Sequence, residues 1–207
     1  MSIKLKHSGG NAVSLHPPTS APTSSDVQFK LPTADGSANQ VLKTDGSGNL
    51  SFGADSGGLN ASYARLADVK GNTTQGGSFT SGAWRTRDIT TEETDPDGIV
   101  SISSNQFTLQ AGTYHIDASC CAVGVDNHSA RIYNVTDSST TLTGLANKNQ
   151  EDNVSDYAHV RGQFTIAAAK TFELQHRCYT TVSTHGFGAY SSWNNNVYSI
   201  IEIHKRN

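Results

Sequence analysis

The chain has 207 residues and a formal charge of −3 at neutral pH, with 15 Lys and Arg against 18 Asp and Glu. A protein that binds nucleic acid through its phosphates needs a basic surface, so this composition predicts no nucleic-acid partner. No apolar run reaches the length of about 18 residues that a membrane-spanning helix requires. The N-terminal MSIKLKHSGG also lacks the apolar centre of a signal peptide. We therefore expect no membrane insertion, and synthesis in the cytoplasm.

Residues that build a core are concentrated toward the C-terminus. Twelve of the sixteen aromatic residues, both Trp and all three Cys follow residue 82, whereas four of the five Pro precede it. This distribution predicts three parts: a leader at residues 1–53, a Gly- and Ser-rich linker at 54–82, and a β domain at 83–207. Only the last part is long enough to bury a core of its own.

The leader opens with apolar residues that alternate on either side of a Ser-Gly-Gly-Asn turn. This pattern predicts a small β-hairpin. A lone hairpin is marginally stable in water, so we expect it to dock on a partner. The candidate attachment residues are Ile3, Leu5, Val13 and Leu15.

Further along the leader, two Asp-Gly turns begin at Asp35 and Asp45, each followed by a short apolar stretch. Such turns predict an alternation of turns and short strands. Strands as thin as these gain a core when identical copies of the chain wind together, which favours a trimerising role. In the linker, the stretch from Leu59 to Val69 predicts one or two turns of helix.

In the C-terminal part, the stretch from Phe107 to Val125 gives the clearest strand signal. Tyr114, Ile116, Ala118 and Cys120 alternate there with polar residues, as in a strand with one buried face. The turn signal Ala111-Gly112 just before it predicts a hairpin with the strand that ends at Leu109.

Several other short runs have the same β-branched or aromatic character, and Gly, Asn, Asp or Ser bounds each of them. These runs are Ala130–Val135, His159–Ile166, Thr171–Thr181 and Val197–His204. Many short strands without a helical period of useful length predict an all-β sandwich or barrel.

The sequence predicts no catalytic residue, metal ligand or cofactor, and the chain is not expected to be an enzyme. It has no Gly-x-Ser-x-Gly motif, no phosphate-binding loop and no Cys-x-x-Cys spacing. The acidic loop around Asp95 and Asp97 is typical of a weak calcium site and also of a solvated turn, and the turn is favoured. The three cysteines are expected to act as small hydrophobic residues of a core or an interface, and this is favoured over a redox-active role.

The eight histidines lie on separate strands and loops, without the spacing of a metal-binding motif. Three equivalent histidines on the axis of a trimer would bind a metal without any motif in one chain. His115 and His176 are the candidates for such a ring. The favoured alternative is a hydrogen-bonded histidine on a strand.

The segment from Thr184 to Val197 is the candidate binding loop. Phe187, Tyr190 and Trp193 are spaced there among Gly, Ser and Asn residues, including Asn194. Aromatic rings stack on sugar rings while amides and hydroxyls bond to sugar hydroxyls, and the same mixture forms adaptable protein-binding loops. The alternative is that these aromatic residues pack beneath the loop or against a neighbouring subunit.

Residues 2–53 contain HSGGN, LPTADGSANQ and KTDGSGNLSF. In these motifs they closely resemble the N-terminal segment of virion structural proteins encoded by marine tailed phages, above all cyanophages. The resemblance implies a shared attachment or trimerising leader that precedes a variable tip. It does not distinguish a tail fibre from a head fibre or another appendage.

A second resemblance covers residues 83–207 and is carried by AWRTRDIT, FTLQAGTYHIDAS, GQFTIAAAKTFELQHRC and YSIIEIHKR. Their order resembles the strands of the trimeric jelly rolls of the complement globular head and tumour necrosis factor type. The resemblance implies a homotrimeric jelly-roll β-sandwich.

Together these features predict a virion protein, a trimeric fibre or spike whose jelly-roll tip is displayed outward. Its expected partners are two further copies of itself, other virion proteins through the leader, and a polysaccharide or protein of the host surface through the tip. The alternative is a decoration or cement protein of the capsid that has no specific ligand.

Overall fold

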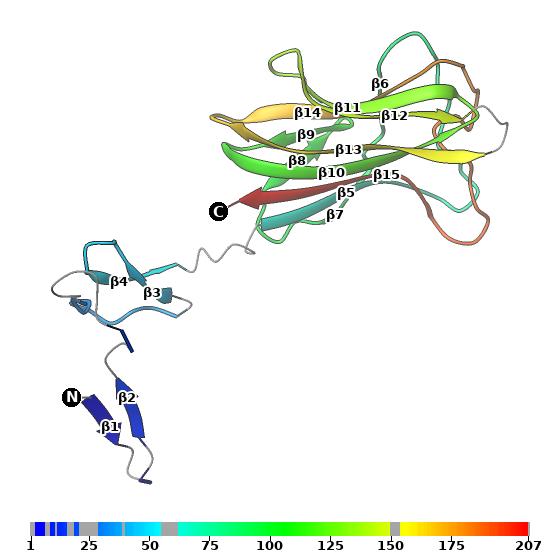
Figure 1. Cartoon of the computed structure of the whole chain (residues 1–207). Helices are drawn as coiled ribbons and strands as arrows, with labels where there is room; N and C mark the ends of the chain where they lie inside the picture. Colours follow the sequence, from blue (N-terminus) through cyan, green and yellow to red (C-terminus); the bar gives the residue numbers. More distant parts are fainter. Residues whose placement is uncertain are drawn as a thin grey trace. The chain divides into compact units, whose positions relative to one another are not determined.

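The computed structural model divides the chain into two compact units, Met1–Gly57 and Gly58–Asn207 (Figure 1). It describes residues 3–6, 9–10, 12–15, 19–20, 29–38, 40–54, 62–149 and 154–206. All regular elements in these ranges are β-strands, which confirms the predicted all-β class.

The first unit contains the predicted hairpin. Strands β1 (Ile3–Lys6) and β2 (Ala12–Leu15) pair antiparallel, with Ile3 opposite Leu15 and Leu5 opposite Val13. A second hairpin joins β3 (Gln40–Thr44) to β4 (Leu50–Ala54).

The turn of the second hairpin explains its Asp-Gly-Ser-Gly-Asn sequence. The Asp45 carboxylate accepts hydrogen bonds from the backbone N–H groups of Ser47 (2.8 Å) and Asn49 (3.1 Å). Gly46 and Gly48 supply the positive φ angles of the turn, 79° and 86°. Lys30 pairs with Asn49 in a single parallel bridge beside this hairpin.

The second unit has eleven strands within its described residues, 62–149 and 154–206. They are β5 (Ser62–Lys70), β6 (Arg85–Thr86), β7 (Thr91–Thr94), β8 (Val100–Ser103), β9 (Gln106–Leu109), β10 (Gly112–Val123), β11 (Asp126–Asn134), β12 (Ser139–Asn149), β13 (Ser155–Ile166), β14 (Lys170–Cys178) and β15 (Asn196–Arg206). The strands that the sequence predicted after residue 106 are confirmed.

Two antiparallel sheets face each other in this unit (Figure 1). One has the order β13-β10-β15-β5-β7, and the other has the order β12-β11-β14-β9-β8, with β6 paired to β14. From β9 onward the chain changes sheet at almost every connection, and only β11 and β12 are both consecutive and paired. This crossing pattern in two packed antiparallel sheets is a jelly roll, which confirms the predicted fold.

The predicted hairpin at Ala111-Gly112 is wrong. β9 pairs with β8 and β14, whereas β10 pairs with β13 and β15 in the opposite sheet. The chain therefore crosses between sheets at this turn. A turn signal indicates where the chain reverses, but strand pairing is decided by contacts far away in the sequence.

The predicted helix between Leu59 and Val69 is also wrong, and residues 62–82 are not a linker. β5 pairs with β15 along nearly its whole length and also with β7. Ala64 and Leu66 are fully buried in the main core, and Phe79 is fully buried in a second cluster. Pairing in the sheet overrides the helix propensity of Ala, Arg and Leu, so the jelly roll starts at β5.

The main core lies between the two sheets. Tyr114, Ile116, Ala118 and Cys120 point into it from β10, as the alternation predicts. Side chains of the facing sheet complete it, namely Phe107, Leu109, Ala130, Ile132, Phe172 and Leu174. Burial of each large side chain stabilises the fold by about 1.5–3 kcal/mol.

Candidate functional site

One buried arginine anchors the predicted binding loop. Arg87 is fully buried, and its guanidinium donates hydrogen bonds to the carbonyl oxygens of Cys121 (3.2 Å), Phe187 (2.9 Å) and Tyr198 (2.9 Å). Burial lowers the pKa of Arg87, but an arginine keeps its charge in proteins. The planar guanidinium therefore joins the loop to strands β10 and β15.

Charges near Arg87 balance this buried cation. Asp68, also buried, lies 3.5 Å from Lys70 Nζ, and Asp88 lies 2.7 Å from the same atom. Burial raises the pKa of Asp68, while Lys70 and Arg87 oppose that change by favouring the carboxylate. The cluster holds β5 and the segment before β7 against the anchor.

Phe187 packs beneath the loop. Its ring centre lies 4.0 Å from the Arg87 guanidinium carbon and 4.4 Å from the Phe79 ring centre. Phe187 and Val182 pack against the small buried cluster that contains Phe79. For Phe187 the structure therefore agrees with the alternative interpretation, in which the aromatic residues pack beneath the loop.

The tip of the loop stays accessible. Trp193 is 85% exposed, Tyr190 is 43% exposed, and Asn194 is exposed. The flanks are fixed, because Tyr190 N–H donates to Gln75 Oε1 (3.0 Å) and Ser191 donates to Asn196 Oδ1. Ligand binding by Tyr190, Trp193 and Asn194 stays a prediction.

A buried chain of three side chains crosses the interior. The Cys120 Sγ lies 3.3 Å from His176 Nδ1, and His176 Nε2 lies 3.0 Å from His128 Nδ1. Burial is the main cause that lowers the pKa of His128 and, more strongly, that of His176. His176 is fully buried and contacts two side chains of its own chain, which matches the favoured alternative, a hydrogen-bonded histidine on a strand.

His115 occupies a different environment. It lies half-buried on the outer face of β10, directly opposite His204 of β15, with 6.4 Å between the ring centres. A metal ring through His115 stays the less favoured of the two alternatives, and nothing in this geometry tests it. Within the described ranges, no group of three or more His, Cys, Asp or Glu side chains is placed to hold a metal ion.

The three cysteines are free and buried, as expected of core residues. Burial raises the pKa of Cys120 to about 12 and that of Cys178 to about 11. Thiols with such pKa values carry almost no thiolate at neutral pH, so they are poor nucleophiles.

Asp95 shows how the acidic loop is used. Its carboxylate accepts hydrogen bonds from the N–H groups of Ile99 and Val100, both at 2.9 Å. The carboxylate therefore stabilises its own turn, in agreement with the favoured interpretation.

The outer face of the β13-β10-β15-β5 sheet carries cross-strand charge pairs. Arg161 of β13 pairs with Asp117 of β10. Arg65 of β5 lies 3.9 Å from Glu202 of β15, whose carboxylate also accepts a hydrogen bond from the Tyr63 hydroxyl (3.1 Å). Polar side chains thus form ordered rows on this face.

Arg87 and the charge cluster around it were missed by the sequence interpretation. Arg87 stands in a short polar stretch, Arg-Thr-Arg-Asp, and its partners lie 34, 100 and 111 residues away. The available signal was the alternation of Arg87 and Ile89, which both point inward.

No known protein family and no curated protein matches the sequence. Among solved structures, murine APRIL at pH 8.0 is similar over 70% of this chain and 99% of its own, with 7% identity and a TM-score of 0.48. The globular domain of the zebrafish complement 1qA protein is similar over 72% and 100%, with 13% identity and a TM-score of 0.44. The jelly-roll assignment rests on the strand order of the chain itself.

No helix in the described part of the chain is long and apolar enough to span a membrane.

Proposed function

We propose that the chain is a homotrimeric structural protein of a phage virion. Its first unit attaches to the particle and to the other copies. Its jelly roll forms the outward tip of a fibre or spike and contacts the host surface. The sequence of the leader supports the virion assignment, because residues 2–53 resemble the N-terminal segment of cyanophage structural proteins.

The observation that carries this proposal is the contrast between the two units. The second unit buries most of its large apolar residues in a core, whereas most of those in residues 29–54 are exposed. Phe29 is 68% exposed and Leu31 is 77% exposed, and Leu42 and Phe52 are also exposed. Exposed apolar side chains concentrated in so short a segment mark a surface that another chain covers.

A homotrimer suits both units. Identical thin hairpins gain a shared core by association around a closed symmetry axis. In the jelly roll, the outer face of the β13-β10-β15-β5 sheet is a second surface that contacts between copies would use. Its half-buried residues include His115, His204 and Tyr63. Three tips on one stalk would strengthen weak single contacts with a host surface through avidity.

The test is localisation on the particle. An antibody raised against residues 58–207 should label an appendage of purified virions in electron micrographs. A chain that lacks residues 1–53 should be absent from particles assembled in its presence. Labelling spread evenly over the capsid would favour a decoration protein, and absence from purified particles would overturn the proposal.

A further inference from the structure

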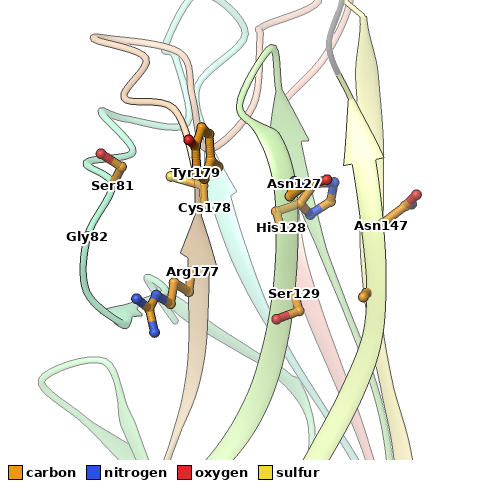
Figure 2. A pocket seen from close by; sticks show the side chains of 10 residues that line it. Ser81, Gly82, Asn127, His128, Ser129, Asn147, Arg177, Cys178 and Tyr179 are labelled. Atoms are coloured by element: carbon orange, nitrogen blue, oxygen red, sulfur yellow. The ribbon is translucent and has the colours of Figure 1, made fainter.

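A pocket of about 510 Å³ opens on the outer face of the second sheet (Figure 2). Its floor is formed by β11 and β14, and one wall is formed by the segment at Ser81 and Gly82. Pockets that bind small molecules have volumes of about 300–1,000 Å³. The size therefore suits one or two sugar rings.

Four side chains of the floor stand together on one face. Ser129 of β11 pairs directly with Arg177 of β14. In the next row, the N–H of Tyr179 donates to the carbonyl oxygen of Asn127 (2.9 Å). Residues two apart on a strand share a face, so the two rows lie beside each other.

The polar groups of this floor are available to a ligand. In the described parts of the chain, the Arg177 guanidinium, the Asn127 amide and the Ser129 hydroxyl form no side-chain hydrogen bond or ion pair. Tyr179 is 73% exposed, so one face of its ring is open. Figure 2 shows Arg177 projecting from β14 beside the Ser81–Gly82 segment.

The wall of the pocket is held in place by the rest of the domain. Ser81 N–H donates to Thr181 Oγ1 (3.0 Å), and Phe79 pairs with Val182 in an isolated bridge. The Arg85 guanidinium donates to the carbonyl oxygens of Thr80 (3.1 Å) and Ser81 (3.4 Å). A wall fixed in this way loses little entropy when a ligand binds.

The pocket favours an anion although the whole chain is acidic. None of the described residues that line it is Asp or Glu, and Arg177 is among them. Arg131 lies two residues after Ser129 on β11, so both side chains are on the same face of the strand. Its guanidinium carbon lies 4.3 Å from the Trp84 ring centre and 4.5 Å from that of Tyr133. The face therefore carries two arginines and two aromatic rings, with the Glu173 carboxylate near Arg131.

We propose that this pocket binds a carboxylated sugar. The Arg177 guanidinium pairs with the carboxylate through two parallel hydrogen bonds. The Tyr179 ring stacks on one face of the sugar ring. The Asn127 amide and the Ser129 hydroxyl form hydrogen bonds with the sugar hydroxyls. The inference deepens the proposed function and rests on it for the source of the sugar, an acidic polysaccharide of the host surface.

The test is a calorimetric titration of the full-length protein with three probes: an oligomer of glucuronic acid, a glucose oligomer of equal length, and acetate. We expect binding of the glucuronic acid oligomer only. R177Q and Y179A should each weaken that binding by about tenfold or more, since each removes a charged pair or a stacking contact of at least about 1.4 kcal/mol. R206Q, which removes an exposed arginine from the opposite sheet, should bind as the wild type does.

Three results would overturn the inference. The first is no binding of the acidic oligomer at millimolar concentration. The second is equal affinity for the glucose oligomer or for acetate, which would indicate a general sugar or anion site. The third is loss of binding in W193A but not in R177Q, which would place the ligand on the loop. The titration needs no virion, so failure of the proposed localisation would leave its result unchanged.

Discussion

The guanidinium of Arg87 donates a hydrogen bond of 2.9 Å to the carbonyl oxygen of Phe187, a residue 100 positions further along the chain. It also lies over the Phe187 ring and donates to the carbonyl of Tyr198. One buried side chain thus ties the base of the loop to the sheet. The tip of the loop at Trp193 is exposed, whereas the base of the loop at Phe187 is held to the sheet by Arg87.

R87M should strongly destabilise the jelly roll. The substitution keeps much of the side-chain volume, but it leaves the carbonyl groups of Cys121, Phe187 and Tyr198 without their donor. It also removes one of the two cations, Arg87 and Lys70, that favour the Asp68 carboxylate. Removing one partner of a buried charged network costs about 3–5 kcal/mol. Urea unfolding followed by tryptophan fluorescence measures the loss.

The matched control for R87M is R161M, which removes an arginine from an exposed ion pair with Asp117. Exposed pairs contribute about 0–1 kcal/mol, so R161M should unfold close to the wild type. Equal stability of R87M and R161M would contradict the anchoring role of Arg87.

Gly188 should not tolerate a side chain. A Cβ atom at this position would lie 2.1 Å from Tyr198 Cδ1, and the backbone φ of 143° is unfavourable for other residues. G188A is expected to lower the free energy of unfolding by about 1–3 kcal/mol, because both overpacking and backbone strain act there.

The control for G188A is G82A. Gly82 also has a positive φ, 87°, but nothing lies within 4 Å of its added Cβ. G82A should therefore lower the free energy of unfolding by about 1 kcal/mol, the contribution of the unfavourable backbone conformation alone. A smaller loss of stability in G188A than in G82A would contradict the close packing of the loop on Tyr198.

The pair His128 and His176 should make the domain sensitive to acid. Burial lowers the pKa of both imidazoles in the folded state from the ordinary value of 6.5. Below pH 6.5 the unfolded chain therefore binds more protons than the folded chain, and stability falls as the pH drops. Above pH 7 the contribution of these groups is constant. The slope should reach at most about 1.4 kcal/mol per pH unit for each histidine.

Urea unfolding of the wild type and of H176Q at several pH values between 5 and 8 tests this prediction. H176Q should have a smaller loss of stability on acidification than the wild type. The same slope in H176Q and the wild type would show that His176 is not the titrating group.

The alternating strands of the jelly roll could be predicted, but the start of the domain and its anchor could not. Tyr114, Ile116 and Ala118 repeat every second residue, so their buried face is visible in the sequence. β5 reads Ser-Tyr-Ala-Arg-Leu-Ala, which has no such β-branched pattern, and its strand conformation comes from pairing with β15. Arg87 and Phe187 meet only through the fold, since nothing local links them.

Fragments of the chain test the corrected start of the domain. Residues 58–207 should fold alone, because the core clusters lie within them. Residues 83–207 should aggregate or remain unfolded, because loss of β5 removes Ala64 and Leu66 from the core and leaves β15 as an open edge. Circular dichroism and size exclusion compare the two fragments. A folded, soluble 83–207 fragment would show that β5 is dispensable.

The central claim, a trimer built through an N-terminal unit that leaves its apolar residues exposed, is tested most directly by the native mass of the full-length protein. Light scattering after size exclusion should give three times the chain mass of 22.0 kDa. A stable species at 22.0 kDa across the accessible concentration range would contradict the claim, because Phe29 and Leu31 would then remain exposed without a partner copy.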